Sequence, residues 1–272
     1  MSKKYINSVL IEDNKVIKKN NGKIEDLYNL FDTVSFNNCP RIIDIDEENV
    51  TYEFLEGSKY HELSEGVEFI RTVSMLHYKT LFFKDVSLNK YENIYNMILG
   101  NINYLRKYYT DLISDIESSM FMSPSSYLIA RNYSIINDSL NISLEFLNKW
   151  YKLVKNKTSE RVCIIHNNLS LEHFIKNKNN YLISFDNYET DTPILDLYKF
   201  YKNEGYKLNF SYLFNVYNEN LLLLEEEKLL FYILICMPLK IEKNGNEYLD
   251  CINIGKIFKY INTSLKLINS WK

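Results

Sequence analysis

The chain has 272 residues, a net charge of −3, 46% hydrophobic residues and 25% charged residues. This length allows one large core or two lobes, and the composition is ordinary for a soluble globular protein. A negative net charge argues against a nucleic-acid-binding surface, so no nucleic-acid partner is expected.

Cysteine spacing and hydropathy exclude two further classes of protein. The 4 cysteines are widely separated and form no Cys-x-x-Cys pair, so neither disulfide nor zinc chemistry is expected. No apolar run reaches the roughly 18 residues that a membrane-spanning helix needs, and the first residues lack the apolar region of a signal peptide. We therefore expect a cytoplasmic protein without membrane contact.

The first part of the chain predicts two hairpins and a short helix. Strands at 5–11 and 15–19 flank a polar turn, a helix follows at 26–31, and a second hairpin joins 41–45 to 50–55. This order is that of a small, β-rich lobe in an α+β protein.

The chain becomes helical from about residue 64. Apolar residues recur at helical spacing over 64–78, 94–116, 127–136 and 144–154, and Ser123-Pro124 interrupts the series. His77, near the end of the first of these helices, is expected to be a packed or hydrogen-bonded core residue, because a single imidazole needs a partner to do chemistry. Four further helices are predicted at 195–201, 212–217, 221–237 and 252–268.

Residues 161–201 form the most informative segment. An apolar strand at 162–165 leads to His166 and a polar loop, two short strands at 174–175 and 181–183 follow, and a helix begins near Pro193. Its motif residues are, in order, His166-Asn167-Asn168, four residues, His173, then Ile183-Ser184-Phe185-Asp186, Thr192-Pro193 and Asp196-Leu197.

This segment resembles the aminoglycoside phosphotransferase and choline kinase superfamily, whose pattern is His-Gly-Asp, four residues, Asn, Ile-Asp-Phe-Asp, Asp-Pro and Asp-Leu. The resemblance covers 161–201 at motif level and most of the chain in layout. It implies a bilobal, protein-kinase-like α+β fold, with a small β-rich N-terminal lobe at 1–57 and a mainly helical C-terminal lobe at 58–272. The family's spore-coat-associated branch is also similar, which allows a bacterial spore-coat context.

Three positions of the implied active site depart from the family. Asn168 stands where the family has its catalytic Asp, and an amide is not a base near neutral pH. His173 replaces the magnesium-binding Asn, and magnesium binds imidazole poorly. Ser184 replaces the magnesium-binding Asp with a neutral hydroxyl. Together these changes predict that none of the three positions is catalytically active.

Other family positions are kept. His166 matches a histidine that braces the loop, and Asp196 matches the aspartate that anchors the loop from the following helix. No metal site is expected. The fallback is Asp186, which in a strand would point to the same face as Ser184 and could offer a displaced metal site. The alternative is that Asp186 is only the second acid of the motif.

A nucleotide site, if present, would use the N-terminal lobe. By resemblance, Lys18 is the strand lysine that holds phosphates and Glu25 its helix partner, while Glu53 and Leu55 lie in the hinge that binds adenine. A solvated edge role for Lys18 stays open. The first hairpin turn, 12–14, contains no glycine, which lowers the expectation of a phosphate-covering loop.

The sequence therefore favours a pseudokinase that acts as a non-catalytic binding or assembly module, with no cofactor. Its partner would be an unidentified protein or small molecule. Two alternatives remain: an ATP- and Mg²⁺-dependent small-molecule kinase with an atypical metal site, and a nucleotide- or metabolite-binding sensor that never turns over.

Overall fold

The computed structural model describes residues 4–6, 9–57, 63–87 and 89–271. Asn7 and Ser8, inside the first predicted strand, lie outside these residues. The chain folds into two compact units built from separate segments: Met1–Phe82, Arg161–Phe200 and Tyr212–Leu222 form the first, and Phe83–Glu160, Tyr201–Ser211 and Leu223–Lys272 the second. These units are not the same as the two predicted lobes, so the lobe boundary expected at residue 57 stays a prediction.

The first unit begins with an antiparallel sheet of 5 strands in the order β1-β2-β3-β5-β4. Both predicted hairpins and the short helix between them are present, but the strand predicted at 5–11 is wrong, because β1 and β2 are separate strands that pair antiparallel with each other. The elements are β1 (Lys4–Ile6), β2 (Val9–Glu12), β3 (Lys15–Lys19), α1 (Ile24–Thr33), β4 (Ile42–Ile45) and β5 (Asn49–Glu53).

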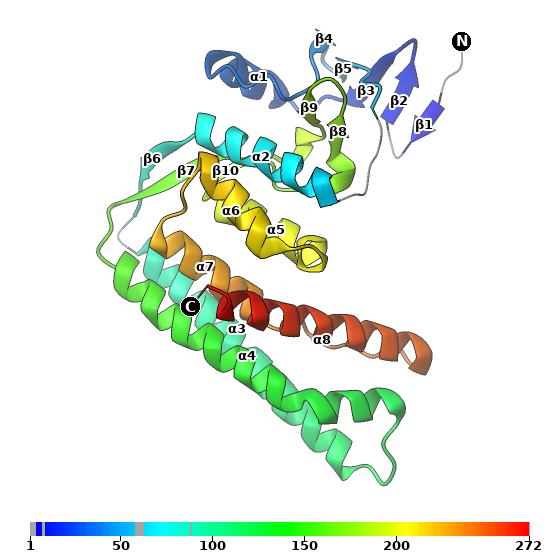
Figure 1. The fold of residues 1–272 in the computed structure, drawn as a ribbon, viewed down its shortest axis with the longest axis vertical. Helices are drawn as coiled ribbons and strands as arrows, with labels where there is room; N and C mark the ends of the chain where they lie inside the picture. The colour runs from blue at the N-terminus through cyan, green and yellow to red at the C-terminus, as the bar shows by residue number, and fades with distance from the viewer. Residues whose placement is uncertain (1–3, 7–8, 58–62, 88, 272) are drawn as a thin grey trace. The chain divides into compact units, whose positions relative to one another are not determined.

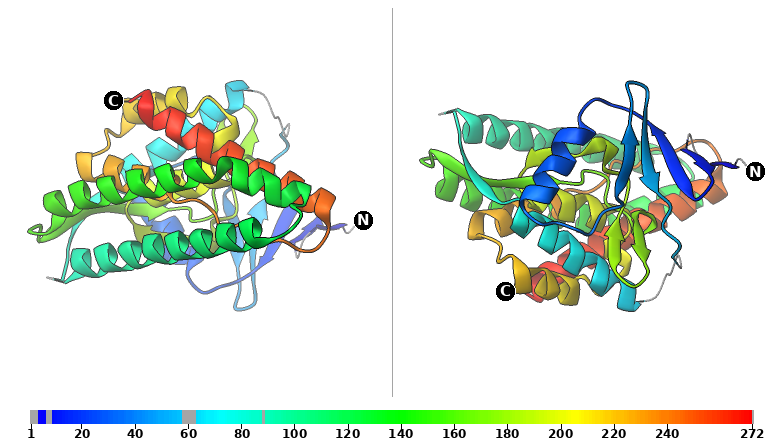
Figure 2. Two further views of the ribbon diagram at one scale, coloured as in Figure 1. Left: turned by 90° about the horizontal axis from the view of Figure 1, so that it is seen from below. Right: turned by 90° about the horizontal axis from the view of Figure 1, so that it is seen from above.

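Helix α1 packs on this sheet through one face (Figure 2). Ile24, Leu27 and Phe31 recur at helical spacing and are buried. Tyr28 lies on the same side, with its ring centroid 6.1 Å from that of Tyr52 on β5. Aromatic contacts of this kind hold the helix at a defined place on the sheet.

The rest of the first unit surrounds the motif segment. Its elements are α2 (Leu63–Lys79), β7 (Ser159–Ile165), the 3-10 helix η1 (Leu171–His173), β8 (Phe174–Lys176), β9 (Asn180–Leu182), the 3-10 helix η2 (Phe185–Asn187), β10 (Glu189–Asp191), α5 (Ile194–Asn203) and α6 (Phe210–Asn220), of which β7, α5 and α6 extend past the unit's bounds. β7 pairs antiparallel with β10, and β8 with β9. Phe69 on α2 packs against α5 and β8 in one core. Its ring centroid lies 4.9 Å from that of Phe200 and 5.7 Å from that of Phe174.

The second unit is mainly helical. Helices α3 (Lys90–Ser118) and α4 (Pro124–Val154) lie side by side as a hairpin (Figure 1), and α4 also packs on α7 (Glu225–Cys236) and α8 (Glu247–Asn269). Its other elements are β6 (Phe82–Asp85), which begins one residue before the unit, and the 3-10 helix η3 (Gly205–Lys207). Two buried serines of α4 are small enough for close approach to α7, and Ser143 Oγ donates to the Ile233 carbonyl at 3.1 Å.

The predicted α+β class is confirmed: a small β-rich N-terminal region precedes a largely helical remainder. Two predictions about the helices were wrong. Residues 127–154 belong to one continuous helix rather than two, because buried packing along α4 outweighs the weak helix formers between them. Helix α7 begins at Glu225 rather than at 221. Among the described residues no helix is long and apolar enough to cross a membrane.

Candidate functional site

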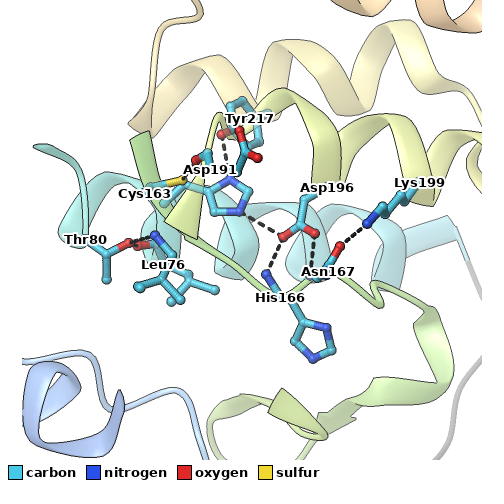
Figure 3. Close-up of polar contacts among 11 residues, drawn as sticks. Leu76, Thr80, Cys163, His166, Asn167, Asp191, Asp196, Lys199 and Tyr217 are labelled. Carbon is cyan, nitrogen blue, oxygen red and sulfur yellow. Dashed lines mark hydrogen bonds and ion pairs between the residues drawn. The ribbon is translucent and has the colours of Figure 1, made fainter. Parts of the chain in front are cut away.

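The carboxylate of Asp196 organises the loop that follows β7 (Figure 3). It is fully buried, and the backbone N–H groups of His166 and Asn167 each donate to one of its oxygens at 2.7 Å. Charge-assisted hydrogen bonds of this kind are about twice as strong as neutral ones. Asp196 on α5 thus fixes the path of the chain at the start of the loop.

A second layer holds Asp196 in place. His77 on α2 is buried, and its Nε2 lies 3.1 Å from Asp196 Oδ2. A carboxylate oxygen only accepts, so Nε2 carries the proton, and in the neutral tautomer Nδ1 accepts the Tyr217 hydroxyl at 2.8 Å. His77 is therefore a hydrogen-bonded core residue, as its sequence context predicts.

Asn167 takes the left-handed conformation, with φ of 65°. The resembled motif has glycine here, and Asn is among the few other residues that tolerate this conformation. Lys199 Nζ on α5 donates to the Asn167 side-chain carbonyl. The sequence did not single out Lys199, although its position one helical turn after Asp196 places both residues on the same face of α5.

His166 lies at the end of β7 and is buried. Its Nε2–H donates to the Ile183 carbonyl at 2.8 Å, so it ties the loop to the segment after β9. Nδ1 has no hydrogen-bond partner among the described residues. Burial lowers the pKa of His166 below its usual value, against an opposing effect of Asp196, and this favours the neutral ring.

Asn168 precedes η1, and His173 is its last residue. The Asn168 side chain is exposed, and its backbone carbonyl accepts the Nδ1–H of His173 at 2.8 Å. The His173 ring stacks on His166, with centroids 5.7 Å apart and an interplanar angle of 29°. His173 therefore has one ring nitrogen, Nδ1, engaged within the loop.

Ser184 and Asp186 meet at the ammonium group of Lys18. Lys18 Nζ on β3 lies 3.1 Å from Ser184 Oγ and 2.8 Å from Asp186 Oδ2. The expectation that Ser184 and Asp186 share one face of a strand was wrong, because β9 ends at Leu182. Ser184 is left-handed, with φ of 69°, and Asp186 belongs to η2. The turn, rather than strand periodicity, brings both side chains to Lys18.

Glu25 is not the partner of Lys18. It is exposed on α1, and no ion pair joins the two residues within the described part of the chain. Tyr28 takes the inward position instead. Burial raises the pKa of its phenol, and the nearby thiol of Cys39 raises this pKa further. The spacing of Ile24, Leu27 and Phe31 in the sequence could have identified Tyr28 as the inward residue.

The predicted hinge, Glu53 to Gly57, is engaged by the protein itself. The backbone N–H of Glu53 donates to the Arg41 carbonyl at 3.0 Å, and its side chain accepts from the Arg41 N–H at 2.9 Å. A Cβ at Gly57 would lie 2.3 Å from Ile175 Cγ2, so only glycine fits this approach to β8. Leu55 is half-buried. Nucleotide roles for Glu53 and Leu55 remain predictions.

The donor set does not fit magnesium. Mg²⁺ demands oxygen ligands in octahedral geometry, usually with one or two carboxylates. The motif positions offer an amide, an imidazole and a hydroxyl, and the nearby carboxylate of Asp186 is already paired with Lys18. Within the described residues, no group of three His, Cys, Asp or Glu side chains is placed to hold a metal ion.

Comparison with known proteins places the fold. No family model and no curated protein sequence matches the chain. An aminoglycoside phosphotransferase from Alicyclobacillus acidocaldarius has a TM-score of 0.71 at 8% identity, over 99% of this chain and 92% of that one. The AMP complex of the spectinomycin phosphotransferase APH(9)-Ia has a TM-score of 0.57 at 11% identity, over 97% and 92%. Its complex with ADP and spectinomycin has a TM-score of 0.52 at 10% identity, over 95% and 88%. At such low identity the likeness concerns the fold alone: the chain has the fold of the aminoglycoside phosphotransferases.

Proposed function

We propose that this protein is a pseudokinase, a non-catalytic binding or assembly module built on the aminoglycoside phosphotransferase fold. The observation that carries the proposal is the engagement of Lys18 by Ser184 and Asp186. A phosphotransferase needs a base for the substrate hydroxyl and oxygen ligands that hold magnesium against the phosphates. Here the lysine that would meet those phosphates already has a hydroxyl and a carboxylate as partners.

The loop after β7 keeps its structural contacts but lacks its reactive groups, and this difference also supports the pseudokinase proposal. The buried contacts that anchor the start of the loop are kept, with Asp196 accepting two backbone N–H groups and the Nε2–H of His77. By contrast, Asn168 offers no base, and loss of a general base costs about 10²–10⁴-fold in rate. A chain that keeps the architecture of the loop without its reactive groups is suited to binding rather than turnover.

Two other functions rest on the same contact. Lys18 could exchange its internal partners for the phosphates of a nucleotide, which would make the protein a sensor without turnover. Asp186 could instead leave Lys18 and bind a metal, which would give an atypical ATP-dependent kinase for small molecules. The pairing at 2.8 Å opposes the second of these, because a metal would have to displace the ammonium group. A cytoplasmic location is proposed from the hydropathy of the sequence, and a spore-coat context only from the motif resemblance.

The test is a calorimetric titration with ATP, in Mg²⁺ and in EDTA, of the unmodified chain and of the double variant Asn168→Asp/Ser184→Asp. We expect no magnesium dependence in the unmodified chain and a gain of magnesium-dependent binding in the double variant. Lys15→Met, which removes an exposed lysine of the same strand, is the control for Lys18→Met. Tight magnesium-dependent binding by the unmodified chain would overturn the pseudokinase proposal. Metal-independent binding lost in Lys18→Met would support the sensor.

A further inference from the structure

The segment that joins α3 to α4 forms the tip of their hairpin (Figure 1), and three consecutive apolar side chains are exposed there. Met120, Phe121 and Met122 are 89%, 84% and 44% exposed. Single exposed apolar residues are common on protein surfaces, but a contiguous group usually marks an interaction site. Methionine is also the side chain best able to adapt its shape to an apolar partner.

Negative charge lies next to these side chains. Asp111, Asp115 and Glu117 are exposed on the last two turns of α3, and the last turn contains no basic residue. None of the three forms an ion pair within the described part of the chain. Carboxylates at a helix C-terminus face the negative end of the helix dipole, where cations are favoured. A cationic group from outside the chain would relieve this arrangement.

The tip is held in a defined shape. Ser123 caps α4, accepting the Ser126 N–H at 3.3 Å. Glu247 at the start of α8 accepts the Ser125 N–H and, at 3.1 Å, its hydroxyl. A rigid tip loses little entropy when it binds. Tyr127 and Tyr248, in the turns joined by these contacts, are also exposed.

We propose that this tip, residues 111–122, docks a basic amphipathic helix of a partner protein. Apolar side chains of such a helix would cover Met120, Phe121 and Met122, while its lysines or arginines would meet Asp115 and Glu117. An anionic membrane surface would repel these carboxylates. A two-fold contact with a second copy would place the same carboxylates opposite one another.

The experiment uses fluorescence anisotropy with a labelled model peptide, Leu-Lys-Lys-Leu-Leu-Lys-Leu repeated in tandem, and its counterpart with Glu in place of Lys. We expect the unmodified chain to bind the lysine peptide and not the glutamate peptide. The triple variant Met120→Ser/Phe121→Ser/Met122→Ser should weaken binding by about tenfold or more. Asp115→Asn/Glu117→Gln should weaken binding and reduce its salt dependence.

The control is Phe83→Ser/Met97→Ser, which removes two side chains of the same unit that are 68% and 62% exposed but lie outside the tip. Equal weakening by the control and the tip variant would overturn the proposal, as would equal binding of both peptides. It would also be overturned if Phe121→Ser abolished self-association of the chain or binding to phosphatidylserine vesicles. The docking proposal concerns residues of the second unit and goes beyond the pseudokinase proposal. The peptide titration tests only the docking proposal, and the ATP titration tests only the pseudokinase proposal.

Discussion

Replacing Asp196 by alanine should be among the most destabilising single changes in the first unit. The substitution removes the acceptor of three donors: the backbone N–H groups of His166 and Asn167, and His77 Nε2. Each buried donor left unpaired costs about 1–3 kcal/mol, and breaking a buried charged contact by removing one partner costs about 3–5 kcal/mol. Because these costs overlap, we expect a loss of about 3–5 kcal/mol, against a usual total of about 5–15 kcal/mol.

The assay has to report on the first unit. Both tryptophans, Trp150 and Trp271, lie in the second unit, so tryptophan fluorescence would follow the wrong part of the chain. Hydrogen exchange measured by mass spectrometry resolves the two units, with β7 and the loop after it as the reporter and α4 as the internal reference.

The matched control is Asp191→Ala. Asp191 is only half-buried, and its side chain accepts one local N–H, from Thr192, at 2.7 Å. We expect this change to cost about 1 kcal/mol. If exchange in β7 and the loop rose no more in Asp196→Ala than in Asp191→Ala, the anchoring role of Asp196 would be refuted.

Further predictions concern two glycines, one ion pair and one histidine. Gly57→Ala should destabilise the protein by about 1–3 kcal/mol in urea unfolding, since the added methyl would lie 2.3 Å from a side-chain carbon of β8. Gly100→Ala, in open space within α3, should stabilise the protein by up to about 1 kcal/mol. If Gly57→Ala were the more stable of the two variants, the close approach of Gly57 to β8 would be refuted. A double-mutant cycle of Lys18→Met and Asp186→Asn should give a coupling of about 0.2–1 kcal/mol, because Asp186 is 48% exposed; zero coupling would mean that the ion pair does not form in solution. Burial lowers the pKa of folded His166, so the unfolded state binds more protons and stability falls as pH drops below the ordinary value of 6.5. His166→Asn should reduce the loss of unfolding free energy between about pH 7.5 and 5.5, and an unchanged loss would assign it to other groups.

Local patterns in the sequence identify most of the elements. Alternation and polar turns locate the two N-terminal hairpins, and three-four spacing locates α1, α3 and α8. The continuity of α4 could not be predicted in this way. Its middle contains weak helix formers, and only the contacts that α4 makes with α3, α7 and α8 carry the helix through them.

The residues of the candidate site could also be predicted only in part from the sequence. Motif spacing placed His166 and Asp196 at the loop, where the structure finds both residues buried and in contact. The partners of Lys18 could not be predicted from spacing, because Asp186 is 168 positions away along the chain and reaches it through a left-handed turn at Ser184. The family resemblance suggested Glu25 as the partner of Lys18, but the burial pattern of α1 turns Glu25 to the outside.

We propose that the site formed by Lys18, Ser184 and Asp186 does not bind a nucleotide through magnesium. Calorimetric titration of the unmodified chain with ATP tests it most directly, in matched buffers that contain either Mg²⁺ or EDTA. We predict the same titration curve in both buffers, because Asp186 is paired with Lys18 and the other motif positions lack hard, charged ligands. Binding that tightens by about tenfold or more in Mg²⁺, and that Asp186→Asn abolishes, would contradict the claim and make Asp186 the metal ligand of an atypical kinase.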